Sequence, residues 1–289
     1  MDEVRVDSGG ATLVGSYSRA GSTAVVAVHG ASEGTRDWYL YRHLHDVLPP
    51  AGVGVVTFDR RGEGASSGEP SRGAFAVQAE DALALVDVID ADRVGLWGIS
   101  QGGWVAPLAA TRSKRIAFLV LLATPGVTPA AQMRYAVAEQ VRRAGFGAEV
   151  VARAVALREQ AERWVRGEDV PGLDGELAAA RREPWWRLAF LPDGLPPEHE
   201  ADSARRAIAE EMFFEPEPVF GQVRIPTLLF YGDDDGWTPV EPSIAAWRRA
   251  RGDQVEIVVL AETGHEPMLP SGSISPEYEQ KLIHWTGKH

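Results

Sequence analysis

The chain has 289 residues, no cysteine and a formal net charge of −12. The lack of cysteine excludes disulfides, cysteine-ligated zinc, iron–sulfur clusters and thiol catalysis. The acidic balance argues against nucleic-acid and membrane partners, because these are bound through clustered lysine and arginine. We therefore expect a small-molecule substrate, and the length suits one α/β domain with a modest insertion. Composition leaves open whether the protein is a monomer or a homodimer.

The N-terminal residues, Met1 to Arg5, lack the basic and apolar regions of a signal peptide. The longest apolar run, residues 116–123, is too short to cross a bilayer. The sequence therefore predicts a cytoplasmic protein.

Short β-branched and apolar runs alternate with helical periodicity along the first part of the chain. A hairpin is predicted to open it, and the runs at 24–28 and 53–58 are typical of strands buried on both faces of a sheet. The predicted strands are 4–6, 12–17, 24–28, 53–58, 94–99 and 116–122. Helical patterns at 38–48 and 75–89 separate several of them, so the segment predicts a doubly wound, mostly parallel sheet.

A glycine-rich segment, residues 59–68, leaves the strand at 53–58 and could be mistaken for a dinucleotide-binding loop. Its glycine spacing does not fit that motif, because Ser67 stands where the third glycine belongs and no helix begins directly after it. The sequence therefore argues against a nucleotide cofactor.

The alternation of strands and helices stops between Thr128 and Gln222. Arginine-rich helical segments fill this stretch, which is too long for one connection. It predicts an α-helical cap at 128–222, inserted into a core made by 1–127 and 223–289. Strands at 227–231 and 255–260 and a helix at 276–285 then complete the core.

The segment Gly98-Ile99-Ser100-Gln101-Gly102 joins a predicted strand to a predicted helix. A sharp turn between the two needs residues without Cβ atoms on either side of the serine, and glycines stand at both positions. Such a turn exposes Ser100 as a nucleophile and directs the backbone N–H of Gln101 toward a developing anion. The alternative is a turn in which the serine only caps the helix.

A serine nucleophile needs a base, and the base needs a carboxylate to hold it. The predicted strand at 227–231 is followed by Gly232 and three carboxylates, Asp233, Asp234 and Asp235. The strand at 255–260 is followed by Gly264 and His265, which is the natural base.

With Ser100, an aspartate and His265 in this order, the sequence resembles the α/β-hydrolase superfamily along nearly its whole length. The motifs that carry the resemblance are His29-Gly30, Asp59-Arg60-Arg61-Gly62-x-Gly64-x-Ser66-x-Gly68, Gly98 to Gly103, Gly232-x-x-Asp235-x-x-x-Pro239 and Gly264-His265. The resemblance implies an eight-stranded α/β-hydrolase sheet with an inserted α-helical cap. It selects Asp235 as the acid, because the family places this residue three positions after the glycine. It also implies that the N–H of Ala31, with Ser32 as a nearby alternative, is the second oxyanion donor.

Within the superfamily, residues 98–107 and the segment Pro184-Trp185-Trp186-Arg187 resemble bacterial esterases related to acyl thioesterases and to the prolyl-oligopeptidase catalytic domain. This resemblance implies a serine hydrolase that cleaves an ester, a thioester or a lactone with an apolar portion. Amide or small-peptide hydrolysis, and C–C cleavage, cyclisation or acyl transfer on the same fold, remain alternatives. A non-catalytic binding protein that retains the triad is a further one.

Large aromatic residues that follow strand ends or lie in the predicted cap are candidates for a substrate pocket above Ser100. With Ser32, the candidates are Trp38, Trp104, Trp185, Trp186, Phe213, Phe214 and Trp237. The alternative is that the rings of Trp185 and Trp186 only stabilise the cap. Outside the triad, the histidines show no metal-ligand spacing with carboxylates. We therefore expect neither a metal nor an organic cofactor.

Overall fold

The computed structural model describes residues 1–32 and 34–289, which form two compact units. The first unit comprises Met1–Gly126, Pro216–Asp235 and Val240–His289, and the second comprises Val127–Glu215 and Gly236–Pro239. The second unit therefore differs from the predicted insertion at two places. The segment after Glu215 belongs to the first unit, and four residues that follow Asp235 belong to the second.

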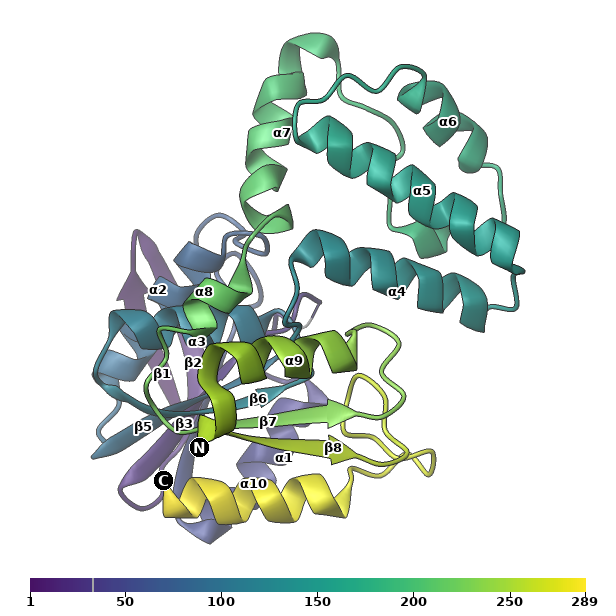
Figure 1. Cartoon of the computed structure of the whole chain (residues 1–289). Coiled ribbons are helices and arrows are strands. Elements are labelled where there is room, and N and C mark those ends of the chain that lie inside the picture. Colours follow the sequence, from purple (N-terminus) through teal and green to yellow (C-terminus); the bar gives the residue numbers. More distant parts are fainter. Residues whose placement is uncertain (33) are drawn as a thin grey trace. The chain divides into compact units, whose positions relative to one another are not determined.

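The first unit is built on one sheet of eight strands in the order β1-β2-β4-β3-β5-β6-β7-β8 (Figure 1). The strands are β1 (Asp2–Ser8), β2 (Ala11–Ser18), β3 (Thr23–Val28), β4 (Val53–Phe58), β5 (Arg93–Ile99), β6 (Ile116–Leu122), β7 (Thr227–Gly232) and β8 (Val255–Leu260). Strand β2 pairs antiparallel with β1 and β4, and all remaining pairs are parallel. The prediction of a doubly wound, mostly parallel, eight-stranded sheet is confirmed.

Helices cover both faces of this sheet (Figure 1). Their bounds are α1 (Tyr39–Val47), α2 (Phe75–Val88), α3 (Gly102–Arg112), α8 (Pro216–Phe220), α9 (Val240–Arg251) and α10 (Pro276–Lys288), with short 3-10 turns at Pro49–Ala51 and Gly252–Gln254. Helices α1 and α10 pack on one face, where Leu44 and Leu282 share an apolar core with Val55 and Phe118. Because both faces are covered, β3, β4, β6 and β7 consist almost entirely of buried residues.

A buried hydrogen bond links the centre of the sheet to the C-terminal helix. Trp97 of β5 donates from Nε1 to the hydroxyl oxygen of Tyr278 in α10 at 2.9 Å. Both side chains are fully buried, and burial raises the pKa of the Tyr278 phenol above its ordinary value. The bond satisfies two polar atoms that would otherwise be costly inside the core.

His45 is a structural residue of α1, in agreement with its lack of metal-ligand spacing. Its ring nitrogens contact Ser18 Oγ at 2.8 Å and Thr57 Oγ1 at 3.0 Å. Burial lowers its pKa from 6.5 to about 4, so the folded protein holds this imidazole neutral where the unfolded chain protonates it.

We therefore expect the free energy of unfolding to fall as pH drops from 6.5 to about 4. Above this window both states carry a neutral ring, and inside it the unfolded chain binds the additional proton. Because the ring is partly solvated, the expected loss is about 1–2 kcal/mol. Urea unfolding at pH 7 and pH 4.5 measures it. His45→Gln should reduce the difference, whereas the exposed control His199→Gln should not, and equal pH dependence in both variants would contradict the assignment.

The second unit is helical and has its own apolar core. It contains α4 (Pro129–Arg143), α5 (Ala148–Val165), α6 (Leu173–Ala180), a 3-10 turn at Trp186–Ala189, and α7 (Glu198–Met212). Helix α4 begins where Thr128 Oγ1 accepts a hydrogen bond from Ala131 N at 3.2 Å and proline follows at the first helical position. Val137, Leu157 and Leu177 from three helices meet in the core. In the part of the chain that the structure describes, no helix is both long and apolar enough to span a membrane.

Candidate active site

Ser100 lies in a strained turn between β5 and α3. Its φ angle is +52°, a left-handed conformation that is costly for a residue with a Cβ atom. A Cβ atom on Gly98 would lie 2.6 Å from the carbonyl oxygen of Gly102, and one on Gly102 would lie 2.6 Å from that of Val28. Both glycines are therefore required for the tight turn, as the sequence predicted. Ser100 N donates to Leu122 O at 2.9 Å, which fixes the turn to β6.

Gln101 begins the helix that follows the serine. It occupies the N-cap position of α3, where the helix dipole favours a negative charge. Its side chain is buried, and its Oε1 atom accepts a hydrogen bond from Gln78 Nε2 of α2 at 3.2 Å. The same Nε2 atom donates to the carbonyl oxygens of Ser71 and Arg72. The residue predicted as an oxyanion donor is thus anchored to a neighbouring helix.

The segment after β3 lies against this turn. Gly102 packs so closely on the backbone of Val28 and His29 that a Cβ atom there would come within 2.9 Å of both carbonyl oxygens. Ala31 and Ser32 follow two residues later and are exposed. The two predicted oxyanion donors, Ala31 and Gln101, therefore belong to segments that contact each other beside Ser100.

The buried carboxylate of Asp235 contacts the half-buried ring of His265. The Nδ1 atom of His265 lies 3.1 Å from Asp235 Oδ1 and 3.0 Å from Oδ2. Asp235 is 2% exposed, whereas Asp233 and Asp234 are exposed. Of the three successive carboxylates, the one that contacts the histidine is the one selected by the family spacing.

The loops after β7 and β8 pack on each other and position this pair. Asp234 N donates to Thr263 O at 3.0 Å. A Cβ atom on Gly232 would overlap the carbonyl oxygen of Gly264, so the close approach requires glycine. These contacts hold the acid-bearing and the base-bearing loops together.

A contact that the sequence did not indicate connects the His265 loop to the segment after β3. The hydroxyl of Tyr39, at the start of α1, donates to Glu266 Oε2 at 2.5 Å. Strands β3, β5, β7 and β8 are parallel, so Ala31, Ser100, Asp235 and His265 all follow carboxyl ends at one edge of the sheet. The Tyr39 hydrogen bond therefore links the loop after β8, the outermost of these strands, to the start of α1.

Asp59 joins the segment after β3 to the glycine-rich segment after β4. Its Oδ1 atom accepts from Arg36 N at 2.9 Å and its Oδ2 atom from Ala65 N at 2.8 Å. Both oxygens are thus bound to backbone donors, and the residue is 4% exposed. The glycine-rich segment that superficially resembled a nucleotide loop supports the segment after β3.

Two pocket candidates of the first unit have different environments. Trp104 is 4% exposed, stacks on Phe75 at 5.4 Å and donates from Nε1 to Pro125 O at 2.7 Å. It packs between α2 and α3, and its place in a substrate pocket stays a prediction. Trp38 is half-buried and packs edge-on against Tyr39 at 5.2 Å.

The candidates of the helical unit also differ in burial. Trp185 is 1% exposed and belongs to the core of that unit, where the Arg153 guanidinium lies 5.6 Å from its ring centroid. Trp186 and Phe213 are half-buried against the same core, and Phe214 is half-buried. Trp237 contacts Phe190 at 5.4 Å. The burial of Trp185 fits the alternative that this ring stabilises the helical unit, and its place in a substrate pocket stays a prediction.

Trp185→Ala is expected to destabilise the helical unit by about 3–5 kcal/mol, because a fully buried indole leaves a large cavity. Trp186→Ala should cost less, since that ring is only half-buried. Thermal unfolding of the two variants compares these losses. If Trp185→Ala changes the preference for acyl-chain length but hardly changes Tm, Trp185 contacts the substrate rather than stabilising the helical unit.

Comparison with known proteins agrees with this architecture. Residues 25–273 match the Alpha/beta hydrolase family. An uncharacterized 31.7 kDa protein of Escherichia coli is 40% identical over 76 residues, which are 24% of this chain and 27% of that protein. The dihydrolipoyllysine-residue acetyltransferase component of an acetoin cleaving system from Pseudomonas putida is 26% identical over 93% of this chain and 65% of its own length. The chain thus spans less than two thirds of each of these relatives.

Solved structures of esterases share the fold. One from Pyrococcus furiosus has a TM-score of 0.66 and 17% identity, covering 99% of this chain and 90% of that one. A thermophilic esterase from Thermogutta terrifontis has a TM-score of 0.59 and 24% identity, covering 100% and 99%. The family match spans most of the chain and includes the turn at Ser100, the Asp235–His265 pair and the loop after β3. The chain therefore belongs to the alpha/beta hydrolase family.

Proposed function

We propose that the protein is a serine hydrolase of small carboxylic esters or thioesters. The observation that carries the proposal is the contact between His265 and the buried Asp235 at the sheet edge where Ser100 is held in a strained turn. A helix-capping serine would have no need of this pair. The likeness to solved esterases supports the fold that such an enzyme uses.

In the proposed reaction, Ser100 Oγ attacks the substrate carbonyl carbon while His265 takes the hydroxyl proton. Asp235 contacts Nδ1, which leaves Nε2 as the nitrogen that accepts this proton. The carboxylate fixes the ring orientation and stabilises the imidazolium that forms.

The carbonyl oxygen becomes negatively charged as the tetrahedral intermediate forms. The N–H groups of Ala31 and Gln101 would donate to this oxygen, and the N-terminus of α3 adds a favourable field. His265 then gives its proton to the leaving alcohol or thiol. Attack of water on the acyl-Ser100 ester, with His265 again as the base, releases the acid and restores the serine.

Ser32 and Trp38 are the described residues of the first unit that we propose as substrate contacts. Ser32 is exposed and directly follows Ala31. Trp38 packs on Tyr39, and the Tyr39 hydroxyl donates a hydrogen bond to Glu266, the residue after His265. A half-buried indole in this place would contact an apolar group of the ester. We also propose that aromatic residues of the helical unit contact the substrate. These are Trp186, Phe213, Phe214 and Trp237.

Acyl transfer is a second candidate, favoured by the similarity of 93% of the chain to an acetyltransferase component. Both reactions share the acyl-enzyme, and they differ in whether water or another nucleophile attacks it. Partition between hydrolysis and transfer in the presence of added alcohols and thiols distinguishes them.

The proposal is tested with a fluorophosphonate probe and a panel of p-nitrophenyl esters, thioesters, lactones and aminoacyl anilides. We expect labelling of Ser100 and turnover of esters and thioesters well above anilides, because alcohols and thiols leave more readily than amines. A folded protein that is not labelled and turns over no member of the panel would exclude a serine hydrolase. Preference for the anilides would identify an amidase instead.

A further inference from the structure

Two consecutive buried arginines follow β4, and their guanidinium groups bind different parts of the fold. Arg61 contacts Asp81, with Nε at 3.1 Å from Oδ2, and its Nη1 atom donates to Gly9 O at 3.1 Å. These contacts tie α2 to the turn between β1 and β2. Arg60 instead contacts the segment that carries the proposed oxyanion donor.

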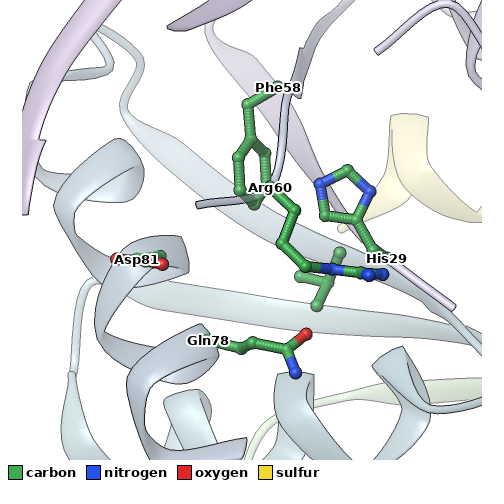
Figure 2. Close-up of a pocket in the computed structure, with 6 residues that line it drawn as sticks. His29, Phe58, Arg60, Gln78 and Asp81 are labelled. Carbon is green, nitrogen blue, oxygen red and sulfur yellow. The ribbon is translucent and has the colours of Figure 1, made fainter. Parts of the chain in front are cut away.

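The Arg60 guanidinium binds two successive carbonyl groups after β3. Its Nη2 atom donates to Gly30 O, and its Nη1 atom donates to Ala31 O at 3.3 Å. The side chain is 1% exposed. Figure 2 shows its guanidinium between His29 and Gln78, in a small pocket that Phe58 and Asp81 also line. Arg60 therefore holds these carbonyl groups from inside the protein.

The direction of these carbonyl groups determines the direction of the neighbouring N–H groups. In a planar trans peptide the C=O and N–H bonds point to opposite sides. Because Gly30 O points inward to Arg60, the N–H of Ala31 must point away from it. The bond to Ala31 O directs the N–H of Ser32 in the same manner, so one guanidinium orients both candidate donors.

Arg60 is itself held by a carboxylate. Glu63 Oε1 lies 3.0 Å from Arg60 Nη1 and also accepts from Arg72 Nε at 2.9 Å. The hydrogen bond from Arg72 is the main cause of a lowered pKa at Glu63, which keeps this carboxylate charged. A Cβ atom on Gly34 would overlap Glu63, and Arg60 N donates to Gly34 O at 2.7 Å. The segment after β3 is thus fixed against this cluster by backbone and side chain together.

We propose that Arg60 is the positioning residue of the oxyanion hole. It holds the Gly30–Ala31 and Ala31–Ser32 peptides so that an N–H group faces the oxygen that becomes negative. This inference rests on the proposed serine hydrolase function. It extends that function to a residue that touches neither the substrate nor the reacting atoms.

The test compares Arg60→Lys with Arg61→Lys. Both variants keep a buried positive charge, but a single ammonium group cannot reproduce the fork that binds two carbonyl oxygens and Glu63. We expect kcat of Arg60→Lys to fall about 10–100-fold with KM changed less than about three-fold, since the loss of one oxyanion donor lowers kcat by at least this much. Affinity for a trifluoromethyl ketone, which forms a tetrahedral oxyanion with the serine, should fall in parallel with kcat. Arg61→Lys should lose thermal stability but keep kcat and inhibitor affinity within about three-fold of the parent.

A second measurement does not depend on activity. Hydrogen exchange of the described residues that follow β3, Gly30 to Ser32 and Gly34 to Arg36, should accelerate about ten-fold in Arg60→Lys and remain unchanged in Arg61→Lys. If Arg60→Lys fails to fold, Glu63→Gln is the substitute. It removes the carboxylate that holds the Arg60 guanidinium, and Glu63 itself is only half-buried. Glu63→Gln should lower kcat and inhibitor affinity and accelerate hydrogen exchange, each by a smaller factor than Arg60→Lys.

The outcomes separate this inference from the proposed function. If the parent protein is labelled at Ser100 and hydrolyses esters, equal kcat, inhibitor affinity or exchange in the two lysine variants overturns the role of Arg60 and leaves the function standing. If the parent is neither labelled nor active, the function fails, and with it the role of Arg60 in an oxyanion hole. In that case the exchange measurement still decides whether Arg60 holds the loop.

Discussion

Ser100→Ala is expected to lower kcat for ester hydrolysis by at least about 10³-fold while the protein stays folded, because the variant lacks the proposed nucleophile. His265→Ala should cause a loss of the same order. The double variant should be no slower than either single variant, since the nucleophile and the base act as one unit. Initial rates with a p-nitrophenyl ester, together with circular dichroism, measure activity and fold.

Ser113→Ala is the matched control for this prediction. Ser113 lies at the other end of α3, where its Oγ atom accepts from Arg115 N at 3.1 Å. Its loss should change kcat less than about two-fold, because such surface positions have small effects. Retention of most activity by Ser100→Ala would remove the proposed nucleophile.

Asp235→Asn is expected to lower kcat by about 10³–10⁴-fold. The Asp235 carboxylate accepts a hydrogen bond from the N–H at His265 Nδ1, and an amide nitrogen in its place would favour the tautomer with the proton on Nε2. That tautomer cannot accept the serine proton. The effect should appear mainly in kcat, because the substrate does not contact the buried aspartate.

Asp233→Asn and Asp234→Asn serve as controls within the same loop. Both side chains are exposed, and we expect each substitution to change kcat by less than about three-fold. The three variants differ only in which of the three successive aspartates is replaced. A severe loss in Asp234→Asn with normal turnover in Asp235→Asn would mean that the acid has been assigned to the wrong residue.

The centre of the sheet could be predicted because β3, β4, β6 and β7 are buried on both faces and therefore have continuous apolar sequences. The turn at Ser100 could be predicted for a similar local reason, since close backbone contacts leave only glycine at 98 and 102. The choice of Asp235 as the acid could not be made from local chemistry alone. Three adjacent aspartates are chemically equal in sequence, and only the family spacing distinguished the one that the structure places against His265.

The arrangement around the oxyanion segment could not be predicted, because it depends on contacts between residues far apart in the chain. Arg60 and Arg61 are identical neighbours in the sequence, yet one binds Gly30 and the other binds Asp81. The packing of Trp104 against α2 could not be predicted for a related reason. Helix α3 is buried on most of its surface, so the sequence pattern does not tell which of its faces meets α2 and which one meets the site.

The left-handed conformation of Ser100 has an evolutionary consequence. A residue with a Cβ atom pays about 1–2 kcal/mol to adopt this conformation, while glycine adopts it freely. Selection for thermodynamic stability alone would therefore not preserve the serine, and drift to glycine at this position would cost the fold little. Under the proposed function, selection for the hydroxyl group would maintain it. A library screened for stability without an activity assay should accordingly tolerate glycine at position 100 and would yield well-folded proteins that have lost the nucleophile.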